Sequence, residues 1–312
     1  MLRSTFLWLS ERRGLFEFVK RNGLARQFSA RFVAGETLDA AISVARDLNA
    51  RNITVSLDLL GESVTTHEAA AGARDAAIEI LDRIQASGVQ ANLSIKLTQM
   101  GLDLDEGLAG DNARRILERA RAHGIFVRVD MEASGHVQRT LDLYDSALRP
   151  AFGDLVGVVI QTMLRRTEDD IEALLAAGAR VRLVKGAYKE PATVAFPGKW
   201  DVDAVFARCS ERLLERGNYP AFATHDEALI THVKDVARAR GVGPERFEFQ
   251  MLYGVRRDLQ DGLRRDGYNV RVYVPFGTEW YPYLMRRMAE RPANVWFIVG
   301  NVLRETVDGR SR

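Results

Sequence analysis

Short runs of apolar, β-branched residues alternate along this chain with longer amphipathic stretches. Each short run has the length and composition of a buried strand, and there are eight of them. They are NITVSLDLLG from residue 52, ANLSIKLTQMG from 91, IFVRVDMEA from 125, GVVIQTML from 157, RVRLVKGAY from 180, AFATHD from 221, FEFQMLYG from 247 and NVRVYVPFG from 269. The pattern predicts eight strands separated by helices.

The stretches between these runs are rich in Ala, Leu, Glu and Arg, and several end in Gly, which favours helix termination. Examples are HEAAAGARDAAIEILDRIQASG, NARRILERARAHG, EDDIEALLAAGA and DVDAVFARCSERLLERG. Eight strand–helix units in about 240 residues are what a (β/α)8 barrel requires. We therefore predict an α/β fold of the TIM-barrel type.

A doubly wound open sheet is the alternative fold, and it normally carries a glycine-rich phosphate turn after an early strand. The nearest match is GVGPER from residue 241, which lacks the third glycine and precedes a strand. We interpret it as a helix-to-strand loop. Residues 1–47 read as helical, so we expect one domain over residues 1–312, with 1–47 as an N-terminal helical extension and 48–312 as the barrel.

Composition agrees with a globular barrel and excludes several classes of protein. The 44 basic and 42 acidic residues nearly cancel, so nothing indicates nucleic-acid binding. The single cysteine, Cys209, excludes a disulfide framework and is typical of a buried structural thiol.

The chain carries no signal for secretion or membrane insertion. Its first apolar run is short and is interrupted by Glu11, Arg12 and Arg13, unlike a signal peptide. No segment reaches the roughly 18 uninterrupted apolar residues of a membrane span. We expect a cytoplasmic protein whose contact with the inner face of a membrane is at most peripheral.

Polar residues interrupt the apolar runs near the predicted strand ends, where barrel enzymes build their active sites. They are Asp58, Lys96, Asp130 with Met131, Gln161, Arg182 with Lys185, Thr224 with His225 and Asp226, Gln250 with Tyr253, and Tyr273 followed by Gly277. A single such residue more often reaches solvent at a strand end. A ring of them predicts an active site.

The segment GTEWYPYLMRRMAERPAN, residues 277–294, predicts an amphipathic helix that ends near Pro292. Helical spacing puts Tyr283, Arg286, Arg287 and Glu290 on one arc. Solvated arginines paired with Glu290 are the simplest interpretation. The position of this helix after the eighth strand favours a binding role instead.

Cations outnumber acids in the predicted ring, which includes Lys96, Arg182, Lys185, Arg286 and Arg287. Two cations about 4 Å apart repel by roughly 4 kcal/mol at an effective dielectric constant near 20. An anion relieves that repulsion. A carboxylate and a dinucleotide pyrophosphate both suit the arginine fork, and the residues alone leave both open.

Other chemistries find little support in the sequence. The five histidines are scattered and only His225 ends a predicted strand, so we predict no metal site. No Gly-x-Ser-x-Gly elbow or Cys–His pair is evident. A lysine Schiff-base lyase, with Lys96 or Lys185 as the amine, remains the rival enzyme class. A non-catalytic carboxylate-binding barrel is a third hypothesis.

Four segments resemble the proline dehydrogenase family, the flavin-dependent enzymes of proline catabolism. They are RVRLVKGAYKEP, ATHD, FEFQMLYG and YVPFGTEWYPYLMRRMAERPAN, and the match runs in order from SIKL near residue 94 to the end. The resemblance implies oxidation of L-proline to 1-pyrroline-5-carboxylate. It also implies FAD as hydride acceptor and a membrane quinone as final oxidant.

The resemblance assigns expected roles to individual residues. Asp130 and Arg182 correspond to the catalytic residues. Lys96, Arg286 and Arg287 are expected to hold the proline carboxylate, and Tyr273 and Tyr283 to close over its ring. The expected FAD contacts are Met131, Gln161, Lys185, Gly186, Ala187, Thr224 and His225.

The chain departs from the large bifunctional relatives in two respects. It reads QTMLRR from Gln161, where those relatives carry an Ala-Tyr pair after the glutamine. It also lacks the length for their aldehyde dehydrogenase and DNA-binding segments. The resemblance therefore implies a monofunctional bacterial enzyme that passes its product to a separate pyrroline-5-carboxylate dehydrogenase.

Overall fold

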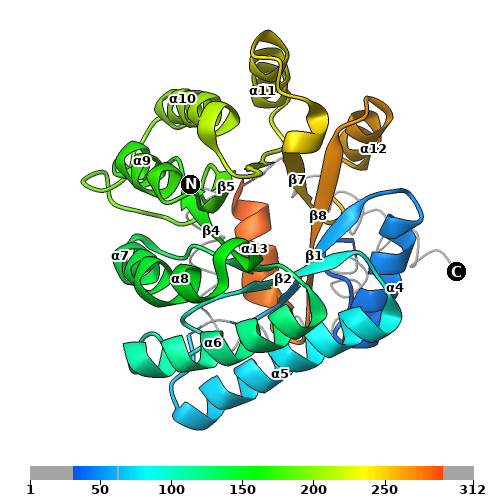
Figure 1. The fold of residues 1–312 in the computed structure, drawn as a ribbon, viewed down its shortest axis with the longest axis vertical. Helices are drawn as coiled ribbons and strands as arrows, with labels where there is room; N and C mark the ends of the chain where they lie inside the picture. Colours follow the sequence, from blue (N-terminus) through cyan, green and yellow to red (C-terminus); the bar gives the residue numbers. More distant parts are fainter. Residues whose placement is uncertain (1–30, 62, 291–312) are drawn as a thin grey trace, which may run out of the picture.

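The computed structural model describes residues 31–61 and 63–290, and its strands form one closed parallel barrel (Figure 1). Consecutive strands are neighbours, and the eighth pairs with the first. The strands are β1 (Thr54–Leu59), β2 (Ala91–Ile95), β3 (Val127–Val129), β4 (Val156–Gln161), β5 (Arg180–Val184), β6 (Ala221–Ala223), β7 (Glu248–Leu252) and β8 (Asn269–Phe276). Seven of them fall within predicted runs and β4 begins one residue before its run, so the predicted (β/α)8 barrel is confirmed.

Helices surround the barrel and connect successive strands (Figure 1). The α-helices are α4 (Leu38–Asn49), α5 (His67–Ser87), α6 (Glu106–His123), α7 (Ser134–Leu143), α8 (Arg149–Phe152), α9 (Thr167–Ala176), α10 (Lys199–Arg216), α11 (Glu227–Ala239), α12 (Arg257–Arg265) and α13 (Trp280–Glu290). A π-helical turn, η1 (Tyr144–Leu148), and two 3-10 turns, η2 (Gly153–Leu155) and η3 (Pro244–Arg246), complete the elements. The turn η3 lies in the segment that the sequence predicts as a helix-to-strand loop.

Capping residues set where several of these helices begin and end. The Thr37, Thr66 and Asp105 side chains accept hydrogen bonds from backbone N–H groups of α4, α5 and α6. Because Asp105 caps α6, that helix begins six residues before the predicted stretch at residue 112. Gly88 and Gly124 follow α5 and α6 with φ of 67°, the left-handed conformation that ends a helix.

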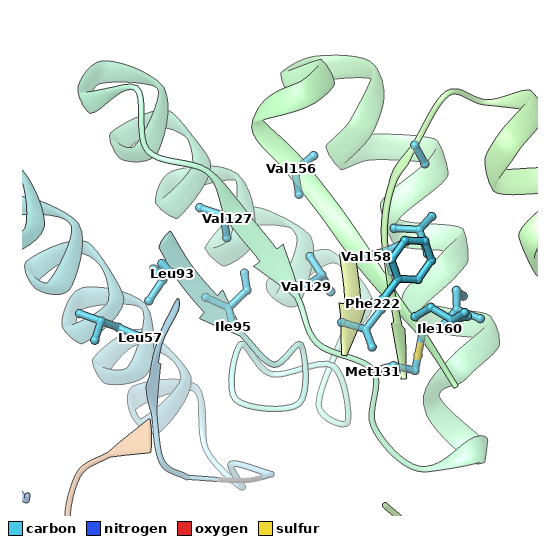
Figure 2. Packing of buried hydrophobic residues seen from close by; sticks show 14 of the residues in the cluster. Leu57, Leu93, Ile95, Val127, Val129, Met131, Val156, Val158, Ile160 and Phe222 are labelled. Carbon is cyan, nitrogen blue, oxygen red and sulfur yellow. The ribbon is translucent and has the colours of Figure 1, made fainter. Parts of the chain in front are cut away.

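The apolar core lies between the barrel wall and the helices. Alternate strand residues point outward into it, as Figure 2 shows for Leu57, Leu93, Val127, Val129 and Ile160. All five are at most 2% exposed. The intervening residues point into the barrel, and many of them are polar or charged.

A short extended segment fastens the start of α13 to the barrel. Ala34 N–H donates to the Pro275 carbonyl at 2.9 Å, and Gly277 N–H donates to the Gly35 carbonyl at 3.0 Å. Trp280 Nε1 donates to Glu36 Oε1 at 3.2 Å. In the view of Figure 1, α13 crosses the middle of the ring of strands. Within the described part of the chain, no helix is long and apolar enough to cross a membrane.

Candidate active site

Three of the predicted site residues form one hydrogen-bonded unit near the C-terminal ends of the strands. Arg182 Nη1 donates to Asp130 Oδ1 at 2.7 Å, and the Tyr273 hydroxyl donates to Asp130 Oδ2 at 2.7 Å. The Arg182 guanidinium also lies 5.3 Å from the centre of the Tyr273 ring. Both oxygens of the Asp130 carboxylate are therefore held, and the three side chains restrain one another.

Two serines extend this unit across the barrel interior. Arg182 Nη2 donates to Ser94 Oγ at 3.3 Å, and Ser94 Oγ lies 3.2 Å from Ser56 Oγ. Sequence reasoning missed both serines because neither stands at a strand end. The available signal was their spacing, since each lies two residues before an acid or a lysine on an otherwise apolar strand.

Lys96 and Asp58 form a second buried pair beside the first. Lys96 Nζ lies 2.6 Å from Asp58 Oδ1, and the two side chains are 11% and 2% exposed. Burial alone lowers the pKa of Lys96, but the Asp58 and Asp130 carboxylates outweigh it and raise that pKa. Lys96 is therefore a charged ammonium at neutral pH. This argues against Lys96 as the amine of the Schiff-base hypothesis, which needs a neutral amine.

Asp58, Lys96, Asp130, Arg182 and Tyr273 are called the mouth cluster below. Of the predicted residues in it, Arg182 and Tyr273 do not stand at strand ends. They lie within β5 and β8 and reach the mouth from inside the wall.

A second group of charges lies at the ends of β5 and β6. Lys185 Nζ lies 2.6 Å from Asp203 Oδ1 and 2.8 Å from Asp226 Oδ2, and Lys199 contacts both of these carboxylates. Burial raises the pKa of Asp226, but hydrogen bonds from the two lysines outweigh burial and lower that pKa to about 2. Lys185, Lys199, Asp203 and Asp226 are called the rim cluster.

Thr224 and His225 stand beside the rim cluster, and each makes a local hydrogen bond. Thr224 Oγ1 accepts from Asp226 N–H at 3.1 Å. His225 Nε2 accepts from Leu252 N–H at 3.0 Å, which leaves the proton of a neutral imidazole on Nδ1.

Gln161 is tied to the neighbouring strand through Glu132, a residue that sequence reasoning missed. Gln161 Nε2 donates to the Glu132 carbonyl at 2.8 Å. The Glu132 carboxylate accepts from Thr98 Oγ1 at 2.6 Å and from Thr98 N–H at 3.2 Å. Burial raises the pKa of Glu132. Glu132 thus fixes the loops after β2 and β3 to each other, two residues beyond Lys96 and Asp130.

Gly186 and Met131 have structural roles of their own. Gly186 has φ of +107°, and a Cβ there would lie 2.4 Å from Met163 Sδ. Met131 belongs to the buried hydrophobic cluster and lies near Ile160 in Figure 2. Ala187 is half-buried. A ligand at Gly186 therefore meets backbone.

The helix that carries the arginine pair is present. Tyr283 is 7% exposed and packs in a cluster with Phe32, Leu60 and neighbours on α13. Arg286 and Arg287 lie within α13, but their side chains are outside the described residues, as is that of Glu290. Their predicted contact with a carboxylate stays a prediction.

Gln250 does not join the site, although the sequence predicts it at a strand end. It lies inside β7 and donates to the Glu248 carboxylate. Glu248 in turn pairs with Arg271, with Nε of Arg271 3.0 Å from Oε1 of Glu248. With Arg128 and Arg180 these residues fill the barrel near the strand starts, and Arg128, Arg180, Glu248 and Arg271 are called the floor cluster.

Cys209 is fully buried, as predicted for a structural thiol. Burial raises the pKa of its thiol to about 12.

Comparison with known proteins agrees with this geometry. The family model for proline dehydrogenase matches residues 41–299. The proline dehydrogenase of Deinococcus radiodurans is 42% identical over 288 residues, which cover 90% of this chain and 93% of the relative. Proline dehydrogenase 1 of Bacillus subtilis is 39% identical over 305 residues, covering 98% of this chain and 100% of the relative.

Solved structures of larger proteins share the fold. Proline utilization A from Bdellovibrio bacteriovorus, inactivated by N-propargylglycine, superimposes with a TM-score of 0.79 at 25% identity. The match covers 85% of this chain and 32% of that one, so this chain spans about a third of that protein's length. Together with the full-length relatives, these matches show that the chain belongs to the proline dehydrogenase family, whose reaction is the first step of proline catabolism.

Proposed function

We propose that this proline dehydrogenase oxidises L-proline to 1-pyrroline-5-carboxylate at the mouth cluster, with FAD as hydride acceptor and a quinone as final oxidant. The observation that carries the proposal is the hydrogen-bonded unit of Tyr273, Asp130 and Arg182 beside the Lys96–Asp58 pair. These side chains give a small zwitterion both a cation for its carboxylate and fixed walls for its ring.

The substrate is held by its one anionic group. Lys96 keeps its charge at neutral pH and offers three donors, of which Asp58 takes one. Arg286 and Arg287 of α13 supply the remaining cations in this proposal, and Tyr273 and Tyr283 close over the ring. Holding the carboxylate fixes the position of C5, the carbon that gives up hydride.

Donor side chains within and just beyond β4, β5 and β6 suit an anionic dinucleotide. Gln161, Arg182, Lys185, Thr224 and His225 follow one another around β4, β5 and β6. All five side chains carry N–H or O–H donors, and Arg182 Nε is buried without a hydrogen-bond partner among the described residues. Met131, Gly186 and Ala187 offer backbone close by. FAD, when bound, supplies the hydride acceptor at flavin N5.

Electrostatic positioning is the main contribution of the chain itself. Arg182 would present positive charge to an electron-rich reduced flavin, and Lys185 would present it to the phosphates of the cofactor. Asp130 orients Arg182 and Tyr273 instead of removing a proton, because both its oxygens already accept hydrogen bonds. Loss of the Asp130 charge is therefore expected to act through the positions of its two partners.

Electrons leave the enzyme in the second half of the reaction. In this proposal they pass to a quinone at the inner face of the membrane, and the product passes to a separate pyrroline-5-carboxylate dehydrogenase. The family resemblance supports both steps. Reduction of a soluble quinone analogue by L-proline, measured with the purified protein, tests the first of them.

The visible absorption spectrum of the purified protein tests the proposal as a whole. Flavin bands that bleach after anaerobic addition of L-proline are expected. A protein that stays colourless after FAD is supplied, or a bound flavin that L-proline leaves unchanged, contradicts it.

Two arginine variants test how the substrate is held. Arg286→Ala and Arg287→Ala each remove a charged hydrogen-bond partner, which costs roughly 2–4 kcal/mol. The proline concentration for half-maximal bleaching is therefore expected to rise about 30-fold or more. Arg265→Ala, at an exposed position near the end of α12, is the matched control. Unchanged proline affinity in both site variants contradicts the role of the pair.

A further inference from the structure

The indole ring of Trp200 is exposed to solvent close to the rim cluster. Trp200 is 89% exposed, and the other exposed large apolar residues of the described chain, Leu104 and Val194, reach only 36% and 38%. Tryptophan gains more from burial than most side chains. A solvated indole beside a candidate ligand site therefore suggests a surface that a ligand covers.

The position of Trp200 on α10 places it next to predicted cofactor residues. It is the second residue of that helix, three before Asp203, so the two side chains share a face. Asp203 holds Lys185, which the family resemblance assigns to FAD. Lys199, the neighbour of Trp200, reaches Asp226 at the end of β6. In Figure 1, α10 lies between α9 and α11 on the outside of the barrel.

The chemistry of this corner suits one part of FAD better than the other. The redox ring must lie beside the mouth cluster, where proline is held. The rim then receives the opposite end of the molecule, which carries two phosphates and an adenine. Two ammonium groups and a flat, electron-rich ring are what an adenine nucleotide requires.

We propose that Trp200 stacks on the adenine ring of FAD, with Lys185 and Lys199 facing its phosphates. The inference rests on the proposed function, because it takes FAD as the cofactor. Asp203 and Asp226 position the two ammonium groups, and each ammonium retains one further donor for a phosphate oxygen. The indole buries its exposed face only when the nucleotide is bound.

Equilibrium dialysis of the purified holoprotein against graded FAD or FMN tests this stacking. FMN lacks the adenine, so it serves as the internal comparison. Trp200→Ala is expected to weaken FAD binding about tenfold and to leave FMN binding unchanged. Trp200→Phe keeps a flat ring and is expected to stay within about threefold of the parent protein. Val194→Ala removes another exposed apolar side chain and is the matched control.

Tryptophan emission gives a second readout that does not depend on turnover. Release of FAD is expected to raise the emission of the parent protein more than that of Trp200→Phe. Equal FAD affinity in Trp200→Ala and the parent overturns the stacking, and so does an equal loss of FAD and FMN binding. A parent protein that binds no FAD contradicts the proposed function instead, so the two failures are distinguishable.

Discussion

The mouth cluster and the floor cluster lie in the same barrel interior, yet they hold their charges by different means. At the floor, Arg128 Nη1 donates to the carbonyls of Arg180 at 2.6 Å and Val158 at 3.2 Å, and Arg271 Nη1 donates to the Val55 carbonyl at 2.8 Å. Within the described part of the chain, the hydrogen bonds of the mouth side chains Lys96, Arg182 and Tyr273 go to other side chains.

Aromatic rings contact arginines in both clusters, but more closely at the floor than the 5.3 Å between Arg182 and the Tyr273 ring. The guanidinium groups of Arg128 and Arg180 lie 4.7 Å and 4.2 Å from the centre of the Phe126 ring. Gly157 leaves room for the Arg128 guanidinium, because a Cβ there would lie 2.5 Å from Arg128 Nη1. Backbone partners cannot be exchanged without moving the fold, whereas side-chain partners can turn toward a ligand. The difference indicates that the floor stabilises the barrel and the mouth serves the reaction.

The largest expected effect is a loss of stability caused by a substitution in the floor cluster. Glu248→Gln removes the carboxylate that pairs with Arg271 and leaves buried arginines without their acid. Breaking such a buried pair costs about 3–5 kcal/mol in the free energy of unfolding, measured by chemical denaturation. The rate of flavin bleaching in the folded variant should stay close to that of the parent. Glu245→Gln, on the exposed η3 turn, is the control. An equal change in the free energy of unfolding in both variants contradicts the structural role of Glu248.

A substitution in the mouth cluster should instead lower the catalytic rate. Asp130→Asn keeps the shape of the side chain but removes the charge that orients Arg182 and Tyr273. A loss of about 100-fold in kcat is expected, equivalent to roughly 2.7 kcal/mol. Asp261→Asn, which disturbs only an exposed pair with Arg51, controls for the substitution itself. A parent-like kcat in Asp130→Asn contradicts the assignment.

A smaller change at the mouth refines the comparison. Tyr273→Phe removes only the hydroxyl that donates to Asp130 and keeps the ring over the site. The loss of one hydrogen bond to a carboxylate costs about 1.5–3 kcal/mol, so kcat/KM should fall at least tenfold. A loss of stability with an unchanged kcat/KM would contradict this assignment and give Tyr273 a structural role.

The smallest expected effect is a change in stability caused by a substitution in the rim cluster. Asp226→Asn removes a charge whose pKa is about 2 in the folded protein and about 3.9 unfolded. Because the folded pKa is lower, the stabilisation is present above pH 3.9 and is lost as the pH falls through 2. Asparagine still caps α11, so less than about 1 kcal/mol should separate the variant from the parent at pH 7. Denaturation curves at pH 7 and pH 3 should show that gap shrinking; a gap that widens in acid contradicts the sign.

The fold could be predicted from the sequence because strand periodicity and helix caps are local signals. The site was harder, because it depends on side chains that meet from distant strands. Asp130, Arg182 and Tyr273 were predicted as members of a ring of polar residues. No local sequence signal indicates that the Asp130 carboxylate accepts hydrogen bonds from both Arg182 and Tyr273. Glu132, Ser56 and Ser94 were missed because they carry no signal besides alternation. Gln250 was placed at the mouth because a buried polar residue inside a strand reads like one at its end.

The rate of anaerobic flavin bleaching by L-proline, compared among the parent, Glu248→Gln and Asp130→Asn, tests the central claim most directly. The measurement is made at a temperature at which all three proteins are folded. The parent and Glu248→Gln are expected to bleach at similar rates, and Asp130→Asn about 100-fold more slowly. Slow bleaching in Glu248→Gln with a parent-like rate in Asp130→Asn would contradict the division between a structural floor and a catalytic mouth.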